Sequence, residues 1–161
     1  MIPFLILDKI KAEFGDKLEL PSHINMLVPA REGWQGSEHD LQKSYFSWLA
    51  SKALERPELM LAHAVPNGGM RDKITAGKLK AEGVKSGVPD VFLPLPRYII
   101  GTGGFNSKDY KGLYIEFKQG NNKPDEDQRA FCLMLDKQGY RVIVTNDLEI
   151  AIGQTIFYLG L

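Results

Sequence analysis

The spacing of apolar positions along the first part of the chain predicts two helices and a short strand. Apolar residues recur at helical spacing over 4–14, and a glycine follows the last of them. A second helical pattern begins after Ser37, which is followed by an acidic first turn, and it stops at Pro57. Residues 59–65 form an apolar run that is short enough for a buried strand.

The remainder of the chain predicts strands that alternate with helices. We expect strands at 88–93, 113–117 and 140–144, and helices at 124–138 and after Asp147. The first two of these strands could form an antiparallel pair. A helix joins the last two, so they should be parallel neighbours connected by a right-handed crossover. The predicted order is therefore αβββαβ followed by a C-terminal helix, which is an α/β fold.

The length of the chain favours one domain with an arm. A chain of 161 residues is long enough for one packed core and short for two domains. Residues 1–36 hold a short helix and a proline-marked stretch, and we interpret them as an N-terminal arm that precedes a domain over 37–161. Within the domain, glycines predict a loop at 101–112, and the basic stretch 70–86 is either a broken helix or an ordered loop.

Composition narrows the class of protein without identifying a partner. Apolar residues make up 43% of the chain and charged residues 25%, which is typical of a soluble globular protein. Basic and acidic residues are equal in number, at 20 each, so any binding of a polyanion must be local. The single cysteine, Cys132, excludes an intramolecular disulfide framework and fits a reducing compartment. No basic residue precedes the apolar run at 1–7, so we expect a cytoplasmic protein with neither a signal peptide nor a membrane span.

Two predicted strands carry side chains that suggest a metal site. Alternation along 113–118 puts Glu116 and Lys118 on one face, and Asp90 begins the strand expected to lie beside them. Two converging carboxylates would repel each other, and a hard divalent ion such as Mg²⁺ would resolve the conflict and activate a water toward a phosphate ester. Lys118 could steer or deprotonate that water, or neutralise charge on the phosphorus. The alternative is a solvated strand pair and a carboxylate that merely opens a turn.

A local excess of basic residues precedes this pair of strands. Five basic residues stand against two acidic ones, and the basic ones are Arg71, Lys73, Lys78, Lys80 and Lys85. Such a segment could contact backbone phosphates without reading bases. A solvated charged surface is the alternative. No phosphate-binding loop of the NTPase type is present in the sequence, which disfavours that class.

Several motifs taken together resemble those of the PD-(D/E)xK nuclease superfamily and, within it, the VRR-NUC family, which includes small phage proteins. The likeness covers residues 37 to about 152. The motifs are Ser37-Glu38, Pro66-Asn67-Gly68-Gly69-Met70-Arg71, Gly83-Val84-Lys85-Ser86-Gly87-Val88-Pro89-Asp90, Ile115-Glu116-Phe117-Lys118, Asp127-Gln128-Arg129-Ala130-Phe131 and Gly139-Tyr140. The arm has no counterpart that we can match.

The resemblance implies a fold and a set of site residues. It implies a restriction-endonuclease-like core with a mixed central sheet flanked by helices. Asp90, Glu116 and the backbone carbonyl of Phe117 would ligate Mg²⁺ or Mn²⁺, and Glu38 would bind directly or through water. Lys118 would be the catalytic lysine, and Gln128 would reach back from its helix toward the site. By the same resemblance and the local charge, the residues expected to contact nucleic acid are Asn67, Arg71, Lys73, Lys78, Lys80 and Lys85.

The function expected from this set is that of a divalent-metal-dependent DNA endonuclease. Stand-alone members of the family resemble Holliday-junction resolvases, so we expect a homodimer, with two sites related by a two-fold axis, and a preference for branched DNA. Two rival hypotheses remain open. One is a DNA-binding module with a decayed site, and the other is a metal-dependent hydrolase of small phosphate esters.

Overall fold

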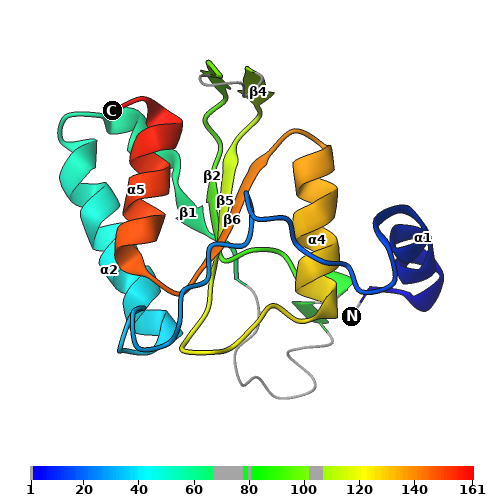
Figure 1. Cartoon of the computed structure of the whole chain (residues 1–161). Coiled ribbons are helices and arrows are strands. Elements are labelled where there is room, and N and C mark those ends of the chain that lie inside the picture. Colours follow the sequence, from blue (N-terminus) through cyan, green and yellow to red (C-terminus); the bar gives the residue numbers. More distant parts are fainter. Residues whose placement is uncertain (1, 67–77, 80, 102–106) are drawn as a thin grey trace.

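The structure is a computed structural model that describes residues 2–66, 78–79, 81–101 and 107–161 (Figure 1). Its helices are α1 (Phe4–Phe14), α2 (Glu38–Ala53), the 3₁₀ helix η1 (Pro57–Leu61), α4 (Glu126–Lys137) and α5 (Leu148–Leu159). Its strands are β1 (His63–Ala64), β2 (Val91–Leu93), β3 (Arg97–Ile99), β4 (Lys108–Tyr110), β5 (Leu113–Phe117) and β6 (Arg141–Thr145). The elements α2, β1, β2, β5, α4, β6 and α5 confirm the predicted αβββαβ arrangement with a C-terminal helix, into which the strands β3 and β4 are inserted.

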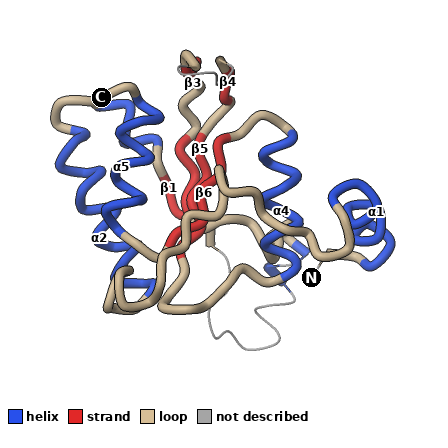
Figure 2. Tube along the Cα trace, in the orientation of Figure 1, coloured by secondary structure: helices blue, strands red, loops and turns tan. Residues whose placement is uncertain are grey.

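A mixed four-stranded sheet forms the centre of the molecule in the order β1-β2-β5-β6. Strands β2 and β5 pair antiparallel and β5 and β6 pair parallel, as the sequence predicted. Helices α2 and α5 cover one face and α4 covers the other, with α1 packed on the outside of α4 (Figures 1 and 2). The apolar residues of β5 that face α2, Ile115 and Phe117, are fully buried against Leu41 and Tyr45 of that helix. Side-chain alternation therefore turns Glu116 toward the α4 side of the sheet.

Side-chain caps fix where the helices begin. The Ser37 side chain accepts a hydrogen bond from the Asp40 backbone amide at the start of α2. Asp125 and Gln128 form a reciprocal capping box at the start of α4, and Asp147 caps α5. The first turns of α2 and α4 lie at the end of the sheet where β5 ends, at the bottom of Figure 1.

Two sequence predictions were wrong in detail. The strand expected over 59–65 is only His63–Ala64, because Pro57 starts a 3₁₀ turn that buries Leu59 in the core. Part of the loop expected over 101–112 is strand β4, which pairs antiparallel with β3 in a hairpin beyond the sheet. The prolines that precede β3 end β2, but the chain returns to extended backbone directly after them.

The segment before α2 runs along the free edge of β6. The Val144 amide donates to the Ile24 carbonyl, the Met26 amide donates to the Val144 carbonyl, and both distances are 2.9 Å. Asn25 and Val144 form a parallel bridge. Residues 24–26 therefore cover an edge of the sheet that would otherwise expose unpaired backbone groups. In the described part of the chain, no helix has the length and apolar character needed to cross a membrane.

Candidate active site

Four of the residues singled out in the sequence lie at one end of the sheet. Asp90 immediately precedes β2, Glu116 is the second-last residue of β5, and Lys118 directly follows that strand. Glu38 is the first residue of α2, which packs over the same end. Residues separated by up to 80 positions in the sequence are thus brought together by the antiparallel β2–β5 pairing and by the packing of α2 on β5.

The Lys118 ammonium group lies between two carboxylates. Its Nζ is 2.6 Å from Oε1 of Glu116 and 3.7 Å from Oε1 of Glu38. The side chain of Lys118 is 9% exposed and that of Glu116 is 2% exposed, whereas that of Glu38 is 44% exposed. One carboxylate therefore lies in the protein interior and the other lies at its boundary with solvent.

The two oxygens of the Glu116 carboxyl group have different surroundings. Oε1 contacts Lys118 and accepts a hydrogen bond of 2.5 Å from Nε2 of Gln128, whose own Oε1 accepts from the Asp125 amide as part of the α4 capping box. Oε2 is buried and has no hydrogen-bond partner among the described residues. The cap of α4 thus orients Glu116 and leaves one buried carboxylate oxygen unsatisfied.

Asp90 is held by the backbone of β5. Its Oδ2 accepts a hydrogen bond of 2.8 Å from the Phe117 amide, so this carboxyl group lies beside the end of β5 that carries Glu116. The Lys118 amide in turn donates to the Thr145 carbonyl at 2.9 Å, which continues the β5–β6 pairing past the end of β5. Backbone pairing therefore fixes the positions from which these side chains extend.

Burial and like charge disfavour ionised carboxylates here. Burial raises the pKa of Glu116 to about 8, and the nearby charge of Asp90 adds to the rise. Burial also raises the pKa of Asp90, although the Phe117 amide opposes the shift. Burial lowers the pKa of Lys118, but the carboxylates of Glu116, Glu38 and Asp90 outweigh it and the net shift is upward. At neutral pH the cluster therefore holds more protons than the same side chains would in water.

The donor set suits a hard divalent cation. Among the described residues, no three His, Cys, Asp or Glu side chains gather into a metal-binding cluster by themselves. The unsatisfied Oε2 of Glu116 is nevertheless an oxygen that a cation could use. If Glu116 is protonated at Oε2, that proton has no acceptor among the described residues. If Glu116 is ionised, Oε2 has no counter-ion on its side. A cation would favour the ionised forms of Glu116 and Asp90 and remove the conflict between them.

Of the residues expected to contact nucleic acid, two can be placed. Lys78 and Lys85 are exposed, and they lie on the chain segment that leads to Asp90. The others, which are Asn67, Arg71, Lys73 and Lys80, lie outside the described residues.

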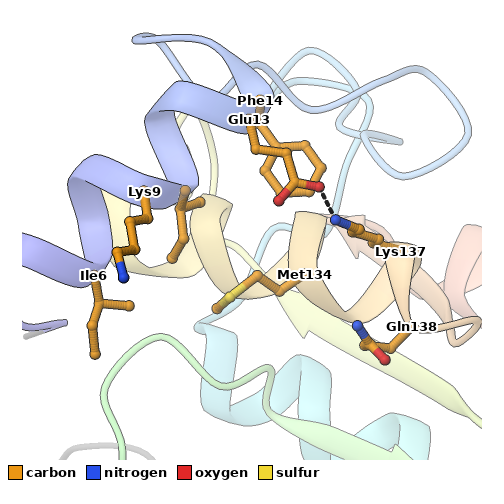
Figure 3. A pocket seen from close by; sticks show the side chains of 8 residues that line it. Ile6, Lys9, Glu13, Phe14, Met134, Lys137 and Gln138 are labelled. Atoms are coloured by element: carbon orange, nitrogen blue, oxygen red, sulfur yellow. Dashed lines mark hydrogen bonds and ion pairs between the residues drawn. The ribbon is translucent and has the colours of Figure 1, made fainter.

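An apolar groove elsewhere on the surface is separate from this cluster. It lies between α1 and α4, and Ile6, Phe14 and Met134 are among the residues that line it (Figure 3). An ion pair between Glu13 and Lys137 crosses it. Few charged groups line the groove, and Glu13 and Lys137 pair with each other. The groove therefore lacks the carboxylate cluster that the sequence predicts for a metal site.

Sequence reasoning did not single out Asn146, which is 1% exposed at the end of β6. Its side chain bonds to the backbone of two segments that flank the cluster. The one signal in the sequence is an asparagine that directly follows a run of apolar and β-branched strand residues and directly precedes a helix cap.

Comparison with known proteins agrees with the resemblance found in the motifs. The family model of the VRR-NUC domain matches residues 28–146. A solved structure described as a VRR_NUC domain protein is similar with a TM-score of 0.62 and 27% sequence identity, and the match covers 80% of this chain and 93% of that one. Its likeness agrees with a restriction-endonuclease-like core. No curated protein sequence matches significantly. With a family model that spans most of its length, this chain belongs to the VRR-NUC domain family.

Proposed function

We propose that this protein is a divalent-metal-dependent endonuclease that hydrolyses phosphodiester bonds of DNA at the cluster of Asp90, Glu116 and Lys118. The family supports a nuclease-type function with DNA as substrate. The observation that carries the proposal is the buried Glu116 carboxyl group, which has one oxygen held by Lys118 and Gln128 and the other without a partner. A structural ion pair would have no need for such an oxygen.

The residues that would hold the metal are those with oxygens at this end of the sheet. We assign Oε2 of Glu116, the carboxyl group of Asp90 and the backbone carbonyl of Phe117 as ligands, and Glu38 would contribute directly or through water. Mg²⁺ and Mn²⁺ both fit, because both prefer oxygen ligands. When bound, such an ion supplies Lewis-acid activation of the phosphodiester and of the attacking water.

The other side chains would orient the metal ligands and neutralise negative charge on the substrate. Lys118 keeps its ammonium group at neutral pH, because the surrounding carboxylates raise its net pKa. We therefore assign it the stabilisation of negative charge that develops on the phosphate. Gln128 fixes the Glu116 carboxyl group by donating to Oε1, and Glu38 contacts the same ammonium group from the solvent side. Lys78 and Lys85 would bind backbone phosphates of the substrate.

We further propose a preference for branched DNA, such as a Holliday junction, and action as a homodimer. Symmetric cuts on a four-way junction need two active sites related by a two-fold axis. The absence of a net charge also favours recognition through local contacts and shape. Light scattering at micromolar concentration tests the homodimer, and a monomeric mass would contradict it. Equal cutting of linear duplex and junction would contradict the preference for branched DNA.

A cleavage assay with matched variants tests the enzymatic proposal. Labelled linear, flapped and four-way DNA would be incubated with the protein and Mg²⁺ or Mn²⁺, with and without chelator. We expect cleavage that chelator abolishes, and loss of turnover with retained DNA binding in Lys118→Ala. Lys108→Ala is the control, because Lys108 lies in the β3–β4 hairpin at the opposite end of the sheet and forms a partly exposed ion pair with Asp136.

Three outcomes would contradict the assignment. Full cleavage by Glu116→Ala would remove the metal site from the mechanism. Binding of DNA that persists in chelator, with no product at any metal concentration, would identify a decayed binding module. Activity on a nucleotide analogue but on none of the DNA substrates would identify a hydrolase of small phosphate esters.

A further inference from the structure

We propose that Asn146 is a positioning residue for this active site, because its side chain ties the segment that leads into Glu38 to the segment that follows Lys118. The inference rests on the proposed function and adds a residue that lies outside the carboxylate and lysine cluster. It also assigns a role to the residues just before α2, which run beside β6.

The contacts of Asn146 use every polar atom of its side chain. Oδ1 accepts from the Val28 amide at 2.9 Å, and Nδ2 donates to the Val28 carbonyl at 2.8 Å and to the Gly120 carbonyl at 2.9 Å. The backbone carbonyl of Asn146 accepts from the Trp34 amide at 2.8 Å. These four bonds join three segments of the chain at one buried point, which we call the Asn146 clasp.

Each segment held by the clasp continues directly into the cluster. Trp34 lies four residues before Glu38, and Gly120 lies two residues after Lys118. Because Glu38 and Lys118 contact each other at 3.7 Å, a shift of either segment changes that distance. The clasp thus fixes the solvent-side carboxylate relative to the ammonium group without touching either of them.

Close packing shows how tightly the clasp is assembled. A Cβ atom added to Gly33 would lie 2.7 Å from the Asn146 carbonyl oxygen and 3.1 Å from Nδ2. A glycine is therefore required where the chain passes over the clasp. Gly33→Ala should separate the two segments while leaving Asn146 itself in place.

Arg141 provides a matched control at the other end of β6. It is also buried, and its guanidinium donates to the His23 carbonyl and to Gln154 Oε1, each at 2.8 Å. It therefore ties the same N-terminal segment to the same strand, but away from the cluster. Arg141→Leu removes comparable hydrogen bonds without disturbing the residues that lead to Glu38.

The experiment compares Asn146→Ala, Gly33→Ala and Arg141→Leu with the wild type, at a temperature where each is folded by circular dichroism. Steady-state cleavage of junction DNA gives kcat and KM. Hydrogen exchange of the metal-free proteins gives the protection of residues 28–40 and 117–121. We expect kcat to fall about 10- to 100-fold in the first two variants with KM within about twofold, and to change little in Arg141→Leu. Exchange should accelerate in both segments for the first two variants only.

Each result decides the inference separately from the proposed function. Equal losses of kcat in the Asn146 and Arg141 variants, or losses proportional to stability, would overturn the positioning role. If Asn146→Ala does not fold, Gly33→Ala provides the same comparison. If the wild type cleaves no DNA, the proposed function fails, and the exchange data alone decide whether the clasp organises Glu38 and Lys118. Unchanged exchange in those segments would then overturn the inference.

Discussion

Replacing Glu116 by glutamine should make the metal-free protein more stable at alkaline pH while preventing it from binding metal. The carboxyl group is buried, and Oε2 has no hydrogen-bond partner in the described structure. Glutamine keeps the size of the side chain and an acceptor for Lys118 and Gln128, but it cannot ionise. The variant therefore removes the charge that burial disfavours and leaves the packing of β5 against α4 in place.

The sign and size of the effect follow from the pKa of Glu116. Because this pKa is raised from 4.5 to about 8 in the folded protein, the native state holds a proton that the unfolded chain has lost between those pH values. Wild-type stability should therefore fall as pH rises from about 4.5 to about 8. At about 1.4 kcal/mol for each pKa unit the upper bound is about 5 kcal/mol. Lys118 titrates with Glu116 and compensates part of this, so we expect a difference on the order of 2 kcal/mol at pH 8.5.

Urea denaturation of the metal-free proteins between pH 5 and 9 measures this difference. The wild type should lose stability over that range, and Glu116→Gln should lose less. Glu58→Gln is the control, because a backbone hydrogen bond and then the contact with Arg56 lower the pKa of Glu58, so it is ionised in both states across the range. Addition of Mn²⁺ at pH 8 should stabilise the wild type and leave Glu116→Gln unchanged. Parallel stability curves for wild type and Glu116→Gln would refute the reasoning.

Three further predictions concern positions around the site. Gly87→Ala should destabilise the protein by about 2 kcal/mol in thermal denaturation, because Gly87 has a φ of +84° and an added Cβ would lie 2.6 Å from a carbonyl oxygen of α4. Gly83→Ala is the control: Gly83 has a φ of +97° but open space around it, so this variant should lose about 1 kcal/mol. Tyr45→Phe should lose about 1 kcal/mol of unfolding free energy without changing cleavage, since it removes a buried 2.8 Å hydrogen bond to a threonine of α5. Replacing Lys78 and Lys85 together by alanine should lower the slope of log binding constant against log salt by about 2, as measured by fluorescence anisotropy with duplex DNA, and an unchanged slope would remove both from the DNA contact surface.

Helices and strands were predicted well from the sequence where local capping residues and the spacing of apolar residues indicated the same element. Helix α4 was expected over 124–138 and spans Glu126–Lys137, because Asp125 and Gln128 form a capping box that sets its start and Gly139, with a φ of +89°, follows its end. Strand β5 was predicted residue for residue from alternation between apolar positions. The helix between β5 and β6 required their parallel pairing. The helix ends and the strand depend on residues close together in the sequence, and the parallel pairing follows from the helix that connects the two strands.

Short apolar runs were predicted less well, because their local patterns fit more than one backbone. The apolar pattern of residues 59–61 fits either a strand or a 3₁₀ turn, and packing of Leu59 into the core selects the turn. The β3–β4 hairpin pairs Arg97 with Tyr110 across a stretch rich in glycine, so its strands had little pattern of their own. Packing against the core decides the first conformation, and pairing between the two strands of the hairpin decides the second.

Local spacing was enough to predict the order of the core helices and strands and the residue types at the site, because helix caps and acidic residues beside a lysine are features of neighbouring positions. Which side-chain atoms have hydrogen-bond partners depends on the packing of remote segments. Oε1 of Glu116 is held from α4 and from Lys118, Oε2 has no partner in the described residues, and Asn146 closes the segments on either side. Burial and hydrogen bonding between remote segments are properties of the packed chain, and no spacing rule in the sequence specifies them.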